Sequence, residues 1–431
     1  MQGSNMESIQ SRLAMMFSSL KIRNYRLYFI GQGFSHIGNW MQTVALGWLV
    51  LELTGSGAQL GAILAFRFAP LLLASPIAGS LVDSYEKRKL LYATQWISFA
   101  LALGMSALVF TDAIEIWMLY VAATLLGLVD AVDRPLRQTF VHEMVGRKEL
   151  RNAVTLSSTE ANLARTIGPV FAGTLIASVG TAFCFFANAL SFVVVIAMLL
   201  RLRSSELHQE AEVSEGPKDW LSGLRYAASV PMIRTILILM AIIGTFAYEF
   251  QVSLPLFAQQ TFHGSAADYA ALLSAMGAGS VAGGLFTASR REVTALEFAI
   301  SALLFGLALC VSAVMPTLAL ATVGMIFVGF FSITLTSVGN TILQLESPSY
   351  IRGRVMALWM TALFGSTLIG APIIGLIGQY AGARWGLAVG GIAAVAAAAF
   401  GARELLRHDR LRSVPIEVVV AEEETAENAT L

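Results

Sequence analysis

"GSLVDSYEKRKLL", residues 79–91, is a polar turn between two apolar blocks, one over about residues 58–81 and the other over about 90–111. Each block is longer than the roughly 18 residues that mark a membrane-spanning helix. The turn contains a run of basic residues at 87–89. Since basic residues beside spanning helices are retained on the cytosolic side, the stretch predicts two transmembrane helices that are joined in the cytosol.

The composition of the whole chain indicates a membrane protein. Of its 431 residues, 56% are hydrophobic and 13% are charged. An ordinary soluble domain has roughly 25% charged residues, so this chain has too few charges to cover a soluble surface. The 28 basic residues equal the 28 acidic residues, which gives no argument for nucleic-acid binding. We therefore expect an all-α membrane protein without a nucleic-acid partner.

Apolar blocks separated by turn and charge signals predict twelve transmembrane helices. Six lie in the first half of the chain, over about residues 27–51, 58–81, 90–111, 114–133, 153–177 and 182–200. Six more lie over about residues 232–257, 268–288, 294–315, 317–342, 355–380 and 385–403. The basic residues near the ends of these blocks lie on one side, with Arg384 as the exception. The positive-inside rule then places both termini in the cytosol.

A polar stretch from Arg201 to Pro231 divides the chain into two predicted bundles of six helices. We expect a first bundle at 1–200, a cytosolic linker with an amphipathic segment at 201–231, a second bundle at 232–404 and a cytosolic tail at 405–431. Weak internal similarity relates the two halves: three residues recur 203 positions later, namely Glu143, Arg151 and Pro169 as Glu346, Arg354 and Pro372. Parallel repeats of this kind are typical of transporters whose substrate site lies between the halves, near the middle of the bilayer.

Three stretches of the chain resemble the major facilitator superfamily of transporters. The signature loop after the second helix of that superfamily is matched by Gly79, Asp83, Lys87 and Arg88. The stretch "RTIGPVFAG" at 165–173, with Gly168 and Pro169, resembles the Gly-Pro signature of its exporters. The stretch "GLVDAVDRPLRQTFVHEMVGRKELRNAVTL" at 127–156 resembles the bacterial enterobactin-exporter and drug-efflux branch. The resemblance covers nearly the whole chain in layout, and it implies the twelve-helix major facilitator fold in a bacterial cytoplasmic membrane.

The resemblance also implies a function. In the superfamily the acidic residue of the loop locks the outward-open state against the start of helix eleven, which corresponds here to Asp83 and the segment near Arg354. A carboxylate is favoured beside the positive end of a helix dipole. The implied activity is proton-coupled efflux (antiport) of an amphiphilic small molecule, such as a drug or a siderophore, by alternating access. Uptake or lipid flipping by the same fold, and a membrane sensor that does not transport, remain alternatives.

A membrane enzyme is the disfavoured class. The sequence has no Cys/His cluster, no phosphate-binding glycine loop and no nucleophile motif. We therefore expect no cofactor and no metal. The expected partners are the small-molecule substrate, protons as the coupling ion and the lipid bilayer, and the protein is expected to be a monomer.

Ionisable residues inside the predicted spans are the main candidates for the transport site, because each costs about 2.5 to 3.5 kcal/mol to insert and needs a cavity or a partner. Arg67 and Glu249 lie at similar depth in different halves. We expect them to line a central cavity and to approach one another in one conformation; a static ion pair between the halves is the alternative. Because a buried carboxylate is favoured when it carries a proton, Glu249 is the first candidate for proton coupling, followed by Asp130 and Glu160.

A second group of charges admits two interpretations. Asp130 forms part of a cluster with Asp133 and Arg134 that also fits a salt-bridge gate at the cytosolic ends of the helices. Arg165, one turn after Asn162, could hold an anionic group of the substrate or could neutralise Glu160 or Asp130. Neutralisation is the preferred interpretation.

The first predicted span carries a polar stripe that is expected to line the pathway. Its members, spaced three or four residues apart on one helical face, are Gln32, His36, Asn39 and Gln42. Aromatic residues near the predicted centre could form a cavity for an amphiphilic substrate: Phe246 with Tyr248, Phe250 and Trp40.

Overall fold

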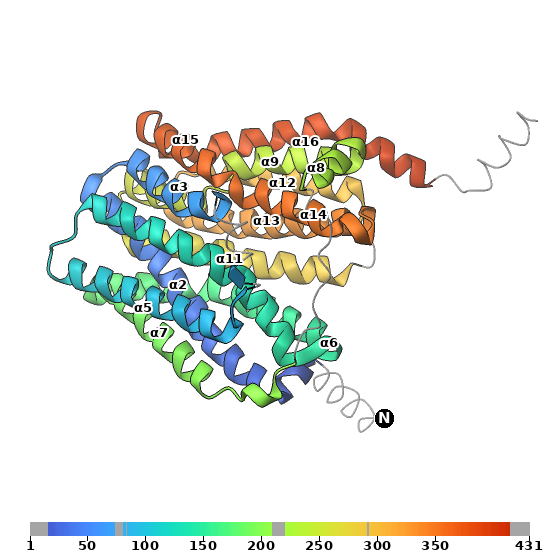
Figure 1. Ribbon diagram of the computed structural model, residues 1–431. Coiled ribbons are helices and arrows are strands. Elements are labelled where there is room, and N and C mark those ends of the chain that lie inside the picture. The colour runs from blue at the N-terminus through green and yellow to red at the C-terminus, as the bar shows by residue number, and fades with distance from the viewer. Residues whose placement is uncertain (1–15, 74–80, 83, 209–219, 291–292, 414–431) are drawn as a thin grey trace, which may run out of the picture.

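The computed structural model describes residues 16–73, 81–82, 84–208, 220–290 and 293–413, and every regular element in these residues is a helix (Figure 1). The first group of helices comprises η1 (Ser18–Lys21), α2 (Arg23–Thr54), α3 (Gly57–Leu73), α5 (Lys87–Phe110), α6 (Ile116–Val179), α7 (Ala182–Leu200) and η2 (Ser204–Glu206). The second group comprises α8 (Trp220–Ser229), α9 (Pro231–Ala247), α10 (Phe250–Leu256), η3 (Phe257–Thr261), α11 (Ala266–Ser289), α12 (Ala295–Val314), α13 (Leu318–Glu346), α14 (Ser349–Met360), η4 (Thr361–Gly365), α15 (Thr367–Tyr380) and α16 (Ala383–Ser413). The predicted all-α architecture is confirmed.

Nine helices in the described part of the chain are long and apolar enough to cross a membrane. One of them, α6, covers two predicted spans, because its backbone is helical throughout except at Gly146, where φ is 64°. The described part of α3 has 17 residues, and α2 contains the polar stripe, which lowers its mean hydropathy. A helical, multi-span membrane protein is therefore confirmed. The count of twelve requires α2, α3 and both parts of α6 to cross, and it remains a prediction.

The predicted span over 232–257 is not one continuous helix. α9 ends at Ala247 and α10 begins at Phe250, so the helix is broken at Tyr248 and Glu249. The Glu249 carbonyl starts the new helix by accepting hydrogen bonds from the N–H groups of Val252 and Ser253. In a bilayer, non-helical backbone is tolerated where it lines a cavity or is buried in protein. A cavity is therefore expected beside Glu249.

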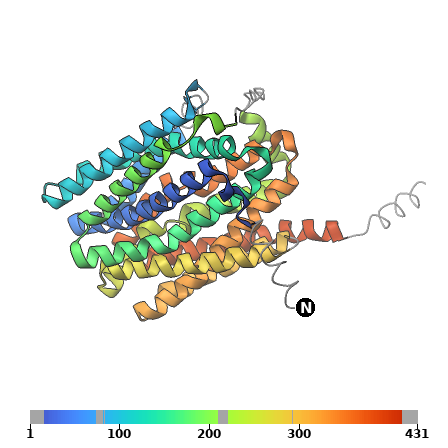
Figure 2. The same ribbon diagram turned by 90° about the horizontal axis from the view of Figure 1, so that it is seen from below.

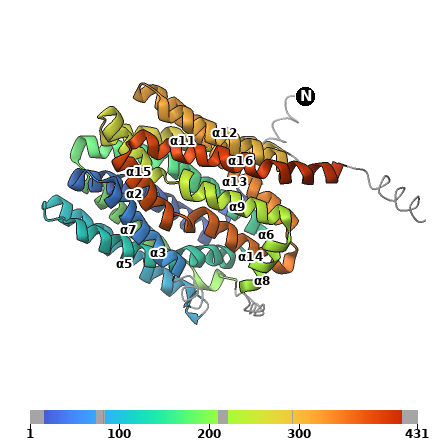
Figure 3. The ribbon, with the colours of Figure 1, turned by 90° about the horizontal axis from the view of Figure 1, so that it is seen from above.

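The long helices run roughly along one common direction in all three views (Figures 1, 2 and 3). α2 packs against α6 and α7, and α5 against α7, while α12 packs against α13 and α16, and α16 against α9. Contacts between the predicted halves come mainly from α3 against α15 and from α11 against α6. The beginning of α2, the short helix α8 and the end of α16 lie at the same end of the bundle (Figure 1). This end is the one that the basic residues predict to be cytosolic.

Small residues allow α3 and α15 to cross closely. A Cβ atom added at Gly61 would lie 2.3 Å from the carbonyl oxygen of Ala371, and one at Gly57 would lie 2.7 Å from that of Gly375. At the same end, the Gln379 Oε1 atom accepts hydrogen bonds from the Ser56 hydroxyl at 2.7 Å and from the Ala58 N–H at 3.0 Å. We refer to these residues as the α3–α15 contact. It lies at the end of the bundle that the sequence predicts to be external.

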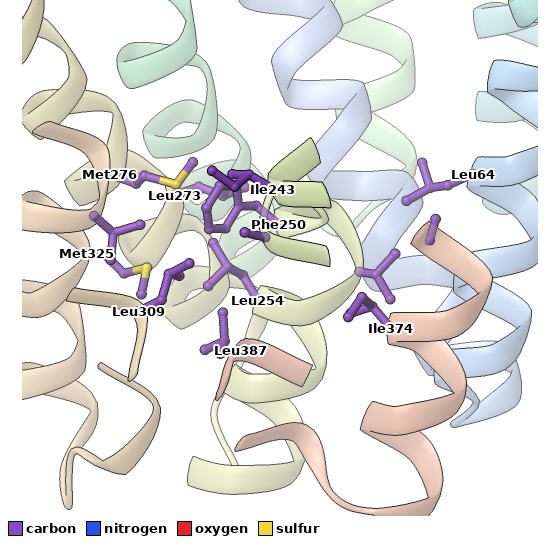
Figure 4. Close-up of a cluster of buried hydrophobic side chains, with 14 of the residues drawn as sticks. Leu64, Ile243, Phe250, Leu254, Leu273, Met276, Leu309, Met325, Ile374 and Leu387 are labelled. Atoms are coloured by element: carbon purple, nitrogen blue, oxygen red, sulfur yellow. The ribbon is translucent and has the colours of Figure 1, made fainter. Parts of the chain in front are cut away.

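An apolar core extends across both predicted halves (Figure 4). Leu64 of α3 points toward Ile374 of α15, while Phe250, Leu273 and Met276 form a second group nearby (Figure 4). A second, separate cluster around Tyr25 and Phe140 lies within the first half.

Some predictions fall on residues outside the described ranges. Gly79 and Asp83 of the signature loop, residues 209–219 of the linker and the tail from residue 414 belong to this set. The division into two bundles and a linker stays a prediction. α16 ends at Ser413 rather than near residue 403.

Candidate functional site

A cavity of about 530 Å³ lies between the predicted halves. Trp40 of α2 and Arg165 of α6 line it from the first half, and Tyr248, Glu249 and Phe250 line it from the break between α9 and α10. We call this space the central cavity. Its volume is in the range of small-molecule sites, and its mixture of apolar walls with a few charged groups is typical of them.

A smaller cavity of about 260 Å³ adjoins the central cavity. Trp40, Phe68, Arg134 and Gln251 line both spaces. Arg67 and Asp130 line only the smaller one. The two cavities thus meet at a wall of shared side chains, and the smaller one contains the denser cluster of charges.

Glu249 is the most deeply placed acidic residue of the central cavity. Its side chain is 4% exposed, and its Oε1 atom has no hydrogen-bond partner among the described residues. Gly370 leaves room for it, because a Cβ atom at that position would lie 2.8 Å from Oε1. A buried carboxylate of this kind is stable only when it is neutral or when a cation approaches it. It is therefore suited to bind and release a proton.

Arg67 does not approach Glu249 in this conformation. Its guanidinium lies 3.4 Å from the carboxylate of Asp130, which also lies 3.4 Å from Arg134. Arg67 and Glu249 thus do not approach one another in this structure. The alternative prediction, a static ion pair between these two residues, is wrong for this structure. Asp130 is the nearer partner because α3 and α6 are packed neighbours in the same half.

Asp133 accepts hydrogen bonds from three side chains. It is 7% exposed and accepts hydrogen bonds from the Thr94 hydroxyl at 2.7 Å and from the Gln95 amide at 3.0 Å. Arg137 donates a further hydrogen bond from Nε and forms an ion pair with it. Arg137 was not among the predicted site residues, although its position four residues after Asp133 on a helix was a readable signal.

Glu160 and Arg165 lie on the same helix but take different partners. Glu160 lies 3.2 Å from the Nδ1 atom of His36. The Arg165 guanidinium lies over the ring of Trp40, with Cζ 5.6 Å from the ring centroid. The preferred interpretation, in which Arg165 neutralises Glu160 or Asp130, is therefore wrong for this structure. The other interpretation, an anion-binding arginine, remains open.

The Gly-Pro pair of α6 brings Arg165 and Trp40 together. A Cβ atom at Gly168 would lie 2.5 Å from the Cβ atom of Trp40, so only glycine permits this crossing of α2 and α6. Pro169 has no N–H group, which leaves the Arg165 carbonyl without its helical donor and loosens the turn. Asn162, one turn earlier, also lines the central cavity.

Some residues of the polar stripe of α2 line a cavity, and others form hydrogen bonds between helices. His36 and Asn39 line the smaller cavity. Gln42 is buried and accepts a hydrogen bond of 2.6 Å from the amide of Asn188 on α7. Phe246 is not in the lining of either of these two cavities, whereas Tyr248 and Phe250 line the central one.

The predicted gating residues form contacts near the ends of the helices. Lys87 forms an ion pair of 2.8 Å with Glu143, and Arg88 donates to the Leu199 carbonyl at 2.9 Å. In the other half, Arg354 donates to the Ser222 hydroxyl at 2.5 Å and the Glu346 carbonyl accepts from Tyr226 at 3.4 Å. Arg151 is exposed, and Pro372 lies within α15 beside the α3–α15 contact.

Comparison with known proteins relates the chain to membrane transporters. The family model described as "Transmembrane secretion effector" matches residues 14–424. The chain is 26% identical over 346 residues to the staphyloferrin A transporter of Staphylococcus aureus. The alignment covers 77% of this chain and 84% of that protein. It is 27% identical over 358 residues to the multidrug efflux pump Tap of Mycolicibacterium fortuitum, with 80% and 87% covered. It is 26% identical over 364 residues to the enterobactin exporter EntS of Citrobacter koseri, with 82% and 85% covered.

Solved structures share the arrangement of helices. A bacterial homolog of the human lysosomal transporter Spinster, in an inward-facing and unoccupied conformation, aligns with a TM-score of 0.72 at 15% identity and covers 89% of this chain and 97% of that chain. A peptide transporter of the POT type aligns with a TM-score of 0.73 at 13% identity, with 90% and 96% covered. At these identities the likeness shows the fold alone.

Proposed function

Because the chain belongs to the transmembrane secretion effector family of major facilitator transporters, we propose that it is a secondary active exporter that exchanges an amphiphilic small molecule for protons. Named relatives include a siderophore exporter and a multidrug efflux pump, which supports export as the direction of transport. The central cavity, with one buried acidic residue at a helix break, is the observation that supports this function.

The proposed mechanism is alternating access around the central cavity. Helix breaks near the bilayer midplane are typical of transporter sites, and the two sets of helices rock around such a site. At the α3–α15 contact, Gly57 and Gly61 lie against backbone atoms of Gly375 and Ala371, so the two helices can separate and re-form this crossing without moving a side chain of either glycine. The central cavity would then open to each side of the membrane in turn.

Glu249 is proposed to carry the coupled proton. It faces the central cavity together with Arg165 of α6, Tyr248 beside it and Thr367 of α15, and of these only Arg165 is a cation. A proton on Glu249 removes the negative charge from this wall of the cavity. Release of that proton to the cytosol restores it, so the charge of the wall alternates during the cycle.

Glu249→Gln is expected to uncouple transport from the proton gradient. With one coupled proton, a gradient of one pH unit supports about a tenfold concentration ratio of substrate, because about 1.4 kcal/mol corresponds to a factor of ten. The variant should lose this accumulation while exchange of substrate for substrate continues. The measurement is uptake of a panel of amphiphilic dyes of both charges into inside-out vesicles with an acidic interior.

The control for this experiment is Glu52→Gln, since Glu52 is exposed at the end of α2 and bonds to Trp48. It should accumulate dye as the wild type does. Accumulation by Glu249→Gln that still follows the pH gradient would remove Glu249 from the mechanism. Accumulation only with the reversed gradient would favour the uptake alternative.

The proposed topology has twelve spans, in two bundles of six, with both termini in the cytosol of a bacterium. The basic residues at one end of the bundle support it. Reporter fusions after residues 215 and 420 are expected to show the same cytosolic location. A periplasmic location for one of them alone would contradict the even number of spans.

A further inference from the structure

Arg165 lies in the wall of the central cavity without an acidic partner among the described residues. Its Nε atom is buried and has no hydrogen-bond partner, and its contact with Trp40 is to a neutral ring. Two carboxylates of the first half are engaged elsewhere: Glu160 with His36, and Asp130 with Arg67 and Arg134. A cation inside a membrane protein is costly unless it is paired or faces a functional cavity. The missing negative charge is therefore expected from a ligand.

The central cavity carries an excess of positive charge. Arg134, Arg165 and Glu249 are the charged members of its described lining. When Glu249 is protonated, the two arginines are the charged residues that remain in this lining. Arg134 forms an ion pair with Asp130. The cavity then offers Arg165 as a cation without an acidic partner among the described residues, and a charge-assisted hydrogen bond to it would be strong.

Aromatic rings also line the central cavity. Tyr248 and Phe250 are arranged edge to face, with ring centroids 6.0 Å apart. The Tyr248 hydroxyl is occupied by its hydrogen bond of 2.9 Å to the Ser332 carbonyl, so the residue presents its ring rather than a free hydroxyl. Such a wall favours an aromatic group of the ligand through stacking and edge-to-face contacts.

We propose that the transported molecule is an organic anion with an aromatic ring, whose anionic group binds Arg165 and whose ring packs against Tyr248 and Phe250. This inference rests on the proposed function, because it assigns the substrate class of the same cavity. A guanidinium holds a planar or tetrahedral oxyanion with two parallel hydrogen bonds, which a lysine at this position could not do.

A series of naphthalene probes that differ only in charge tests this proposal. The probes are 2-naphthalenesulfonate, its neutral sulfonamide and a 2-naphthyl-trimethylammonium cation. Binding to the purified full-length protein in detergent is measured by isothermal titration calorimetry. The sulfonate is expected to bind about tenfold more tightly than the other two, which corresponds to about 1.4 kcal/mol, because a hydrogen bond to a charged group is stronger than one between neutral groups.

The variants separate a binding role from a structural one. Arg165→Gln should abolish the preference for the sulfonate while it still binds the sulfonamide, and Arg165→Lys should retain part of the preference. Lys148→Gln is the matched control, since Lys148 is an exposed cation on the same helix. Its affinities should equal those of the wild type.

Three results would overturn the proposal: equal or tighter binding of the cation, a sulfonate preference that survives in Arg165→Gln, or no binding of any probe. These outcomes are distinct from failure of the proposed function. Sulfonate preference in detergent without proton-driven movement in vesicles would count against the exporter mechanism alone. Proton-driven movement without charge preference would count against the anion alone.

Discussion

Gly61→Leu is expected to reduce transport to less than about one hundredth of the wild-type rate, which corresponds to about 2.7 kcal/mol. The reason is steric. The added Cβ atom alone would lie 2.3 Å from the Ala371 carbonyl oxygen and 2.8 Å from its carbon. Both neighbours are backbone atoms, so neither can rotate away as a side chain would. The α3–α15 contact could then no longer close, and the protein would remain open at that end of the bundle.

The structural readout for this variant is labelling of Gln379→Cys with a maleimide that does not cross the membrane. In the wild-type background, position 379 lies beside Ser56 and Ala58, and the glycine crossings of α3 and α15 keep this end closed without the Gln379 amide, so the introduced cysteine should react slowly. In the Gly61→Leu background it should react several times faster. Cys184 is buried, and the half-buried Cys310 is replaced by alanine in both backgrounds, which keeps the labelling background low.

Gly104→Leu is the matched control, because a Cβ atom at Gly104 on α5 meets no atom within 4 Å. The same change of residue type in a second membrane helix should leave transport unchanged. Wild-type transport by Gly61→Leu would show that closure of the α3–α15 contact is not part of the cycle.

Asp133→Ala is expected to lower the free energy of unfolding by about 3 to 5 kcal/mol, the usual cost of removing one partner of a buried ion pair. Arg137 would remain as a buried cation, and the donors on Thr94 and Gln95 would lose their acceptor. The measurement is the fraction of monodisperse protein that survives heating in detergent, followed by size-exclusion chromatography.

Two further variants test this explanation. Asp130→Ala should lose less stability, about 1 kcal/mol, because Asp130 is more exposed and its two contacts are longer. The double variant Asp133→Leu with Arg137→Met should recover most of the lost stability, since it removes both charges. Equal losses in the single and double variants would show that the hydrogen bonds, rather than the charge of Arg137, account for the effect.

The sequence by itself determined the class of protein. Its low charge content and long apolar blocks require lipid-facing helices, and the helix ends were predicted within a few residues for α5, α7, α11 and α12. The resemblance of the signature loop and of the Gly-Pro stretch identified the superfamily, which the family model confirms. These features are local, so they can be read from neighbouring residues.

Tertiary structure alone decided which side chains meet. Arg67 and Glu249 are predicted at similar depth in their membrane spans, yet Arg67 forms an ion pair with Asp130 on the neighbouring helix α6. Periodicity predicts one unbroken helix over 232–257, whereas the structure breaks it at Glu249 and turns Tyr248 rather than Phe246 toward the cavity. The physical reason is that partners across helices depend on where two helices cross and how closely. Those crossings are set by glycine contacts between segments as distant as residues 61 and 371, which no local pattern contains.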